Sequence, residues 1–206
     1  MMNKREVGNG NPSSTDESTG PEPVQVQKTA TILIVEDEAL IGLGVKLILE
    51  KKGYRVAIAS NGEAAVTIAL ADPTIDLVLM DIDLGRGIDG GAAARKILAR
   101  RSLPIVFHSS HSEPEIVERT EGIPSYGYVV KNPGETVLIA SIRMAFRLWE
   151  SEERFRNAFE KASIGVLLTG LDGTLIRVNA AFCAMLGYES SEFDATNFVA
   201  ITHPDD

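Results

Sequence analysis

Residues 77–85 read LVLMDIDLG, in which an unbroken apolar run ends on two acids, Asp81 and Asp83, and is followed by Gly85. The run is short and rich in aliphatic side chains, which predicts a strand over residues 75–80 that is buried on both faces. A tight turn would explain the two acids, and so would a functional site. The flanking sequence decides between these two interpretations.

Four further runs of the same kind alternate with amphipathic segments that have the apolar spacing of helices. The predicted strands are residues 31–35, 54–59, 75–80, 104–109 and 126–130. The predicted helices are residues 39–52, 62–71, 88–101, 113–120 and 134–149. Five successive strand–helix units predict an α/β fold with a five-stranded, doubly wound parallel sheet, covered by helices on both faces.

Outside this unit the composition changes. Residues 1–29 are rich in Gly, Asn, Pro and Ser and are expected to form a disordered tail before a domain of residues 30–149. Residues 150–162 repeat the helical apolar spacing and are interpreted as a helical linker; whether a new helix starts at Ser151 stays open. Residues 163–206 contain two strand-like runs around an Asp-Gly turn and then a helix, which predicts a small, incomplete α+β unit.

Charge and composition exclude several classes of protein. The formal net charge is -9, which argues against a nucleic-acid partner. Cys183 is the one cysteine, so an internal disulfide is impossible. Charges interrupt every apolar run before membrane-spanning length. We therefore expect a cytoplasmic protein without membrane insertion.

Polar side chains follow the predicted strands at their carboxyl ends, the edge at which open parallel sheets bind ligands. Glu36 and Asp37 follow the first strand, Asp81 the third, Ser109 the fourth and Lys131 the fifth. Three acids brought together repel one another, and Mg²⁺ with its preference for carboxylate oxygens would relieve that repulsion. A carboxylate nucleophile beside a cation and a lysine is suited to phosphoryl transfer, with Asp81 on the central strand best placed to attack.

These segments as a set resemble the receiver domain of two-component response regulators, a flavodoxin-like fold. The matching stretches are ILIVEDE (32–38), LVLMDIDLGRGIDG (77–90), PIVFHSS (104–110) and YGYVVK (126–131). The sequence departs from the family in VVKNPGE, where Asn132 separates the lysine from the proline that usually follows it directly. The effect of Asn132 on this turn is not predictable from the sequence.

The resemblance assigns a role to each residue of the set. The implied metal ligands are Glu36, Asp37, Asp81 and the backbone carbonyl of Asp83. The implied reacting and switching residues are Asp81 as phosphoacceptor, Lys131, Ser109 as switch hydroxyl and Tyr128 as switch aromatic.

The resemblance further implies a partner and a mode of signalling. The phosphodonor would be a histidine kinase or a phosphotransfer protein, and Mg²⁺ would be required. Phosphorylation of Asp81 would draw Ser109 inward, and the ring of Tyr128 would fill the vacated space. Helix five and the linker would relay this change, through a homodimer interface among other routes. The chain would accept phosphate without being an enzyme, since any kinase activity would need a further region.

Residues 151–193 resemble the first half of a PAS domain, a sensor module. The shared features are Asp172-Gly173 in a hairpin, Asn179 at the end of a strand and Gly187-Tyr188 after a helix.

Two other functions compete with the receiver hypothesis. The Asp-x-Asp of MDIDLG resembles the nucleophile motif of haloacid-dehalogenase-like phosphatases, although that motif usually lies on a first strand before Gly-Thr. The second alternative is an interaction scaffold that is never phosphorylated, against which the complete acidic set argues.

Overall fold

The computed structural model describes residues 29–110, 120–131 and 134–193. The predicted tail, nearly all of the predicted helix 113–120, the Asn132-Pro133 turn and the last thirteen residues, 194–206, lie outside this part. The strands are β1 (Thr31–Val35), β2 (Arg55–Ala59), β3 (Ile75–Asp81), β4 (Ile105–Ser109), β5 (Tyr128–Val130), β6 (Leu167–Thr169) and β7 (Leu175–Val178). The helices are α1 (Ala39–Lys51), α2 (Gly62–Ala71), α3 (Gly90–Leu98), α5 (Glu135–Glu160) and α6 (Ala180–Leu186), with a 3₁₀ turn at Ser190–Phe193.

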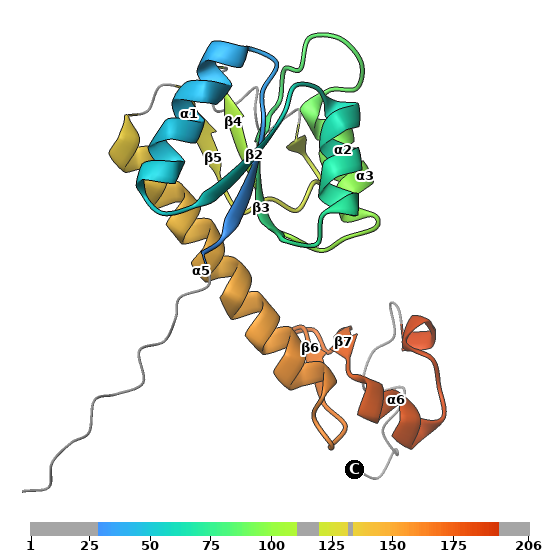
Figure 1. Cartoon of the computed structure of the whole chain (residues 1–206). Helices are drawn as coiled ribbons and strands as arrows, with labels where there is room; N and C mark the ends of the chain where they lie inside the picture. The colour runs from blue at the N-terminus through green and yellow to red at the C-terminus, as the bar shows by residue number, and fades with distance from the viewer. Residues whose placement is uncertain (1–28, 111–119, 132–133, 194–206) are drawn as a thin grey trace, which may run out of the picture.

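The first five strands form one parallel sheet in the order β2-β1-β3-β4-β5. In Figure 1, α1 and α5 lie on one face of this sheet and α2 and α3 on the other. The predicted five-stranded, doubly wound α/β fold is therefore confirmed. β3 lies at the centre of the sheet, which places its carboxyl end between the ends of β1 and β4.

Successive side chains of a strand point to opposite faces of the sheet, so alternate residues pack into two separate cores. In β1, Leu33 and Val35 pack with the small residues of α2 and α3. Ile32 and Ile34 pack on the other face with apolar residues of α1 and α5. Burial on both faces explains why the strands are continuously apolar.

Local capping residues set the helix boundaries. The predicted N-cap Asn61 accepts a hydrogen bond at Oδ1 from the amide of Ala64 at 2.8 Å. α3 is shorter than predicted, because Asp89 caps it by accepting from the amide of Ala92 at 2.7 Å and the helix thus starts at Gly90. Strands β2 and β5 also begin later than predicted, at Arg55 and Tyr128.

The question about Ser151 is answered by α5, which runs without interruption from Glu135 to Glu160 (Figure 1). After it, β6 and β7 form an antiparallel pair joined by a turn in which Gly173 has a φ of 80°. This hairpin and α6 pack around a small separate core of Leu175, Val178, Phe182 and Phe193. Among the described residues, no helix is long and apolar enough to span a membrane.

Candidate functional site

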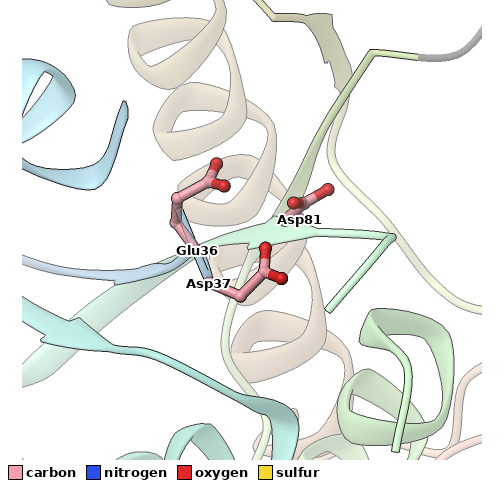
Figure 2. Close-up of side chains that lie close together, drawn as sticks. All are labelled: Glu36, Asp37 and Asp81. Atoms are coloured by element: carbon pink, nitrogen blue, oxygen red, sulfur yellow. The ribbon is translucent and has the colours of Figure 1, made fainter. Parts of the chain in front are cut away.

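Three carboxylates meet where β1 and β3 end. Val35 pairs with Met80 in the sheet, so the residues that follow them, Glu36 and Asp81, come to lie side by side. Together with Asp37 they offer oxygen atoms that all lie within 4.8 Å of one another. Figure 2 shows these three side chains gathered at the strand ends. The convergence expected from strand order is therefore present in the structure.

Lys131 completes this cluster from beyond β5. Its ammonium nitrogen lies 2.8 Å from Oε1 of Glu36 and 2.8 Å from Oδ2 of Asp81. Its backbone amide donates to the carbonyl of Ser109 at 2.7 Å, which ties the lysine to the end of β4. One ammonium group thus bridges the ends of β1 and β3, although these residues are far apart in sequence.

The electrostatic balance of the cluster is negative. Glu36 and Asp81 are 2% and 1% exposed, and burial raises the pKa of both carboxyl groups against the opposing effect of Lys131. Burial also acts to lower the pKa of Lys131, but its hydrogen bonds to the two carboxylates outweigh this and the pKa is raised. The lysine therefore stays charged, and one positive charge does not offset the burial of two carboxylates with Asp37 beside them.

One atom of the cluster shows where a further cation fits. Oε2 of Glu36 is buried and has no hydrogen-bond partner among the described residues. A buried carboxylate oxygen without a donor is costly, and a divalent cation with oxygen preference removes that cost. The exposed carboxylate of Asp37 leaves this side of the site open to solvent. The residues present thus fit Mg²⁺.

The loop after β3 is folded around Asp81. The amide of Asp83 donates to Oδ1 of Asp81 at 3.1 Å, which orients the carboxylate. A Cβ on Gly90 would lie 1.9 Å from the backbone carbonyl oxygen of Asp81, and a Cβ on Gly85 would lie 2.7 Å from Oδ2 of Asp37. Glu63 of α2 accepts from the amide of Ile88 and so fastens this loop from outside.

Sequence reasoning missed Gly85, Gly90 and Glu63 as supports of the site. For the two glycines the only signal is their place in LGRGIDG, which indicates a turn but not what the missing side chains make room for. Glu63 carries no signal at all, because it acts on a loop that is distant in sequence.

The two residues proposed as a switch lie on β4 and β5. Ser109 is fully buried at the end of β4, one residue after His108, which pairs with Asp81. Tyr128 is 42% exposed; its ring stacks on Phe107 and its hydroxyl oxygen accepts from Thr120 at 3.0 Å. The aromatic ring therefore occupies an outer, half-exposed position against Phe107.

His108 is a buried polar residue beside the cluster. It is 3% exposed, and its Nε2 has no partner among the described residues. Burial and the charge of Lys131 lower the pKa of His108 to about 4, so the imidazole is neutral near pH 7. The charged cluster of Glu36, Asp37, Asp81 and Lys131 therefore has a neutral histidine at its edge.

Comparison with known proteins agrees with this geometry. The family model of the response regulator receiver domain matches residues 32–143. The chain belongs to the response regulator receiver family. A PAS family model matches residues 153–206, directly after the receiver domain. Both family resemblances expected from the sequence are confirmed, and nothing supports the phosphatase or scaffold alternatives.

Individual relatives carry related names. The transcriptional regulatory protein PdtaR of Mycobacterium tuberculosis is 39% identical over 116 residues, which are 55% of this chain and 55% of PdtaR. A crystal structure of the N-terminal domain of a response regulator/sensory box/GGDEF protein from Carboxydothermus hydrogenoformans is 45% identical, with a TM-score of 0.57 over 60% of this chain and 98% of that one.

A third relative is the signal receiver domain of a modulated diguanylate cyclase from Desulfovibrio desulfuricans. It is 34% identical, with a TM-score of 0.56 over 61% of this chain and 99% of that chain. This chain spans about half the length of these curated relatives. The chain thus contains a receiver domain, and the relatives named above that share it are regulators.

Proposed function

We propose that Asp81 is the phosphoacceptor and that its donor is a phosphohistidine on a histidine kinase or a phosphotransfer protein. A carboxylate oxygen of Asp81 attacks phosphorus, so that a P–O bond forms while the P–N bond to the imidazole breaks. The imidazole keeps the electron pair of that bond and takes up a proton. The observation that carries the proposal is the 2.8 Å hydrogen bond from the ammonium group of Lys131 to Asp81. The same ammonium group also donates to Glu36.

The proposal includes Mg²⁺ on the acidic side of the cluster. Its ligands would be the carboxylates of Glu36, Asp37 and Asp81 and the backbone carbonyl of Asp83. The buried, unpartnered oxygen of Glu36 supports this assignment. Bound Mg²⁺ would neutralise the charge on the phosphoryl oxygens. Lys131 would take one of these oxygens with its ammonium group, since it already lies at hydrogen-bond distance from the acceptor.

Ser109 and Tyr128 would convert phosphorylation into a change of shape. The new phosphoryl oxygens are strong acceptors, and the Ser109 hydroxyl at the neighbouring strand end is a donor that can turn toward them. The ring of Tyr128 would then move in from its half-exposed position on Phe107. The outer position of the ring in this structure is the starting state that the proposal needs.

The chain as a whole would be a signalling module without catalytic turnover. We assign residues 30–149 to the receiver, 150–162 to a linker continuous with α5 and 163–206 to part of a PAS unit, with a homodimer formed through α5. The uninterrupted helix supports the relay, because a displacement of its first turns reaches Glu160. A cytoplasmic location stays a prediction, as does the absence of a nucleic-acid partner.

Intact mass after incubation with acetyl phosphate and Mg²⁺ tests the acceptor. We expect the wild type to gain one acid-labile phosphoryl group and Asp81→Asn to gain none. Asp76→Asn is the matched control, because Asp76 lies at the other end of the same strand, where it accepts from the amide of Thr31. Chelation of Mg²⁺ should abolish phosphoryl uptake in the wild type and in Asp76→Asn. Uptake by Asp81→Asn, or loss of uptake in Asp76→Asn alone, would contradict the proposal.

A further inference from the structure

The first turn of α2 lies directly against the loop that joins β3 to α3. A Cβ on Gly62 would lie 2.5 Å from the backbone carbonyl oxygen of Ile88, so the two backbones are in close contact. Glu63 contacts the same part of the loop, and its Oε1 accepts a hydrogen bond from the amide of Ile88 at 3.0 Å. A carboxylate acceptor makes this a stronger bond than a neutral acceptor would. The loop is therefore held from α2 at Ile88.

Gly87 makes room for the carboxylate of Glu63. Its φ is 94°, a value that residues with a side chain rarely adopt. A Cβ on Gly87 would also lie 2.6 and 2.7 Å from the two carboxylate oxygens of Glu63. The absence of a side chain at this position thus suits both the turn of the loop and the contact with Glu63.

The other end of the same loop contacts the acidic cluster. The amide of Asp83 donates to Oδ1 of Asp81 at 3.1 Å. A Cβ on Gly85, whose φ is 52°, would lie 2.7 Å from Oδ2 of Asp37. A loop that contains several glycines loses much conformational entropy when it is ordered. A contact that holds this loop in advance therefore lowers the cost of binding a cation beside it.

We propose that Glu63 is a positioning residue for the divalent cation of the acidic cluster. This inference rests on the proposed function, in which the carbonyl of Asp83 and the carboxylate of Asp37 are ligands of Mg²⁺. Glu63 acts through the loop: by holding Ile88 it keeps the backbone of Asp83 and Gly85 in place before the cation arrives. Preorganisation of this kind raises affinity without adding a contact to the ligand.

Two simpler effects of Glu63 depend on its charge and not on its bond to Ile88. As an acid in the first turn of α2, it complements the positive end of the helix dipole. As a negative charge, it adds to the general attraction of the chain for cations. Glu63→Gln separates these effects from the proposal, because glutamine loses the charge but keeps a side-chain oxygen that can accept from the amide of Ile88.

Calorimetric titration of the unphosphorylated whole chain with Mg²⁺ tests the proposal. Glu63→Ala should weaken Mg²⁺ binding about fivefold, whereas Glu63→Gln should stay within about twofold of the wild type. Glu50→Ala is the matched control, because it removes an exposed glutamate from the last turn of α1, where the side chain pairs with Lys46. Its affinity should match that of the wild type. Equal affinities of Glu63→Ala and the wild type, or equal weakening by Glu63→Ala and Glu63→Gln, would overturn the proposal.

A double-mutant cycle tests the contact between Glu63 and Gly87. Gly87→Ala places a Cβ against the carboxylate and should weaken Mg²⁺ binding at least about fivefold. In Glu63→Ala/Gly87→Ala the carboxylate is gone, so the loss of affinity should be smaller than the product of the two single losses. Losses that simply multiply would show that the two residues act independently and would contradict the proposal.

Phosphoryl uptake from acetyl phosphate shows which step Glu63 affects. In Glu63→Ala the Mg²⁺ concentration that gives half of the maximal rate should rise about fivefold, while the rate at saturating Mg²⁺ should stay within about twofold of the wild type. A rate that stays low at saturating Mg²⁺ would contradict a positioning role.

The wild type separates this inference from the proposed function. If the wild type binds Mg²⁺ and is phosphorylated, and Glu63→Ala behaves in the same way, the role of Glu63 is wrong and the acceptor assignment stands. If the wild type binds no Mg²⁺, the proposed metal site is wrong, and the role of Glu63 is wrong with it.

Discussion

Lys131 is in contact with two buried carboxylates, and the balance of these three charges determines what the site can bind. A buried ion pair stabilises a fold only slightly, but removal of one partner leaves the other charge buried without compensation. Here removal of the lysine leaves Glu36 and Asp81 facing each other, at 2% and 1% exposure. The site is thus more sensitive to loss of the lysine than any surface ion pair of the chain.

Lys131→Met should lower the free energy of unfolding by about 3 kcal/mol at pH 7 without Mg²⁺, and by less with Mg²⁺, which takes over part of the compensation. Uptake of phosphate from acetyl phosphate should fall about a hundredfold, because a donor to the transferred group is lost. Urea unfolding and intact mass measure the two effects. Lys52→Met, which removes an exposed ion pair with Glu135, is the control and should change neither by much. Equal behaviour of the two variants would be evidence against the role of Lys131.

His108 should make the fold sensitive to acid. Its pKa is lowered from 6.5 to about 4, so the folded state binds fewer protons than the unfolded state between these values. Stability from this residue is therefore present above pH 6.5 and is lost as the pH falls toward 4, by about 3 kcal/mol in all. In His108→Leu, the difference in unfolding free energy between pH 7 and pH 4 should shrink by that amount. An unchanged difference would mean that His108 is not held neutral by burial.

At the residue scale the sequence predicts the members of the charged cluster better than the residues that hold the cluster in place. Glu36, Asp81 and Lys131 could be found because strand ends of a parallel sheet meet at one edge. Gly90 could not be found in this way, because a Cβ at this position would clash with the backbone carbonyl of Asp81, and this contact exists only in the folded chain. Arg101 could not either, since its guanidinium donates to the carbonyls of Ala69, Asp72, Pro73 and Ile75, and these contacts exist only in the folded chain.

Among the elements, α5 differs most from what the sequence indicates. Ser151 followed by two glutamates has the pattern of a new helix start, and yet the helix continues through it. Capping signals are local. The helix continues because residues 135–160 contain no Gly or Pro and because its second half makes contacts beyond the end of the sheet. The ring of Trp149 packs edge-on against Tyr126 at 5.4 Å, and Arg156 lies over the same tryptophan.

Tyr126 is one of the residues that fasten the second half of α5 to the receiver domain. Tyr126 lies two residues before strand β5 begins, and its hydroxyl donates to Oε2 of Glu152 at 2.5 Å. Burial and the hydrogen bond to Glu152 both raise the pKa of Tyr126, so the hydroxyl stays protonated and able to donate at physiological pH. A movement of β5 would therefore pull directly on the helix outside the sheet.

Tyr126→Phe should remove this link at a cost of about 1 kcal/mol in local stability. Amide hydrogen exchange should rise severalfold in residues 150–160, and phosphate uptake should be unchanged, since the cluster around Asp81 is not touched. Tyr54→Phe is the control: its ring stacks on Phe146 and the substitution removes only a hydroxyl. Equal exchange in both variants and the wild type would show that the helix does not depend on the Tyr126 hydroxyl.

The whole molecule consists of two units that share one helix. The receiver has cores on both faces of its sheet, whereas the C-terminal unit has a small core of its own. The order of these units follows from the sequence, because each has its own pattern of strands and turns. How the second unit attaches could not be predicted, since it depends on a side chain, Asn179, that was expected only as a feature at the end of a strand.

Asn179 joins the C-terminal unit to the end of α5. It is fully buried, and its amide nitrogen donates to the carbonyls of Phe159 and Ile164 at 2.9 and 3.0 Å. Its Oδ1 accepts from the amides of Val166 and Phe182, both at 2.9 Å. All four partners are backbone groups, so the loss of this side chain leaves several of them unpaired in a buried place at about 1–3 kcal/mol each.

Asn179→Ala should therefore unfold the C-terminal unit while the receiver remains folded, because a small core without its polar anchor has little stability to lose. Limited proteolysis should cut within residues 161–193 at least about tenfold faster than in the wild type, following the equilibrium population of the open form. Asn157→Ala is the matched control, since the amide of Asn157 is exposed and donates to the carbonyl of Glu153 on the same helix. Phosphate uptake on Asp81 should be the same in all three proteins. If Asn179→Ala also lost phosphate uptake, the two units would be one cooperative fold, and the division of the molecule at the end of α5 would be wrong.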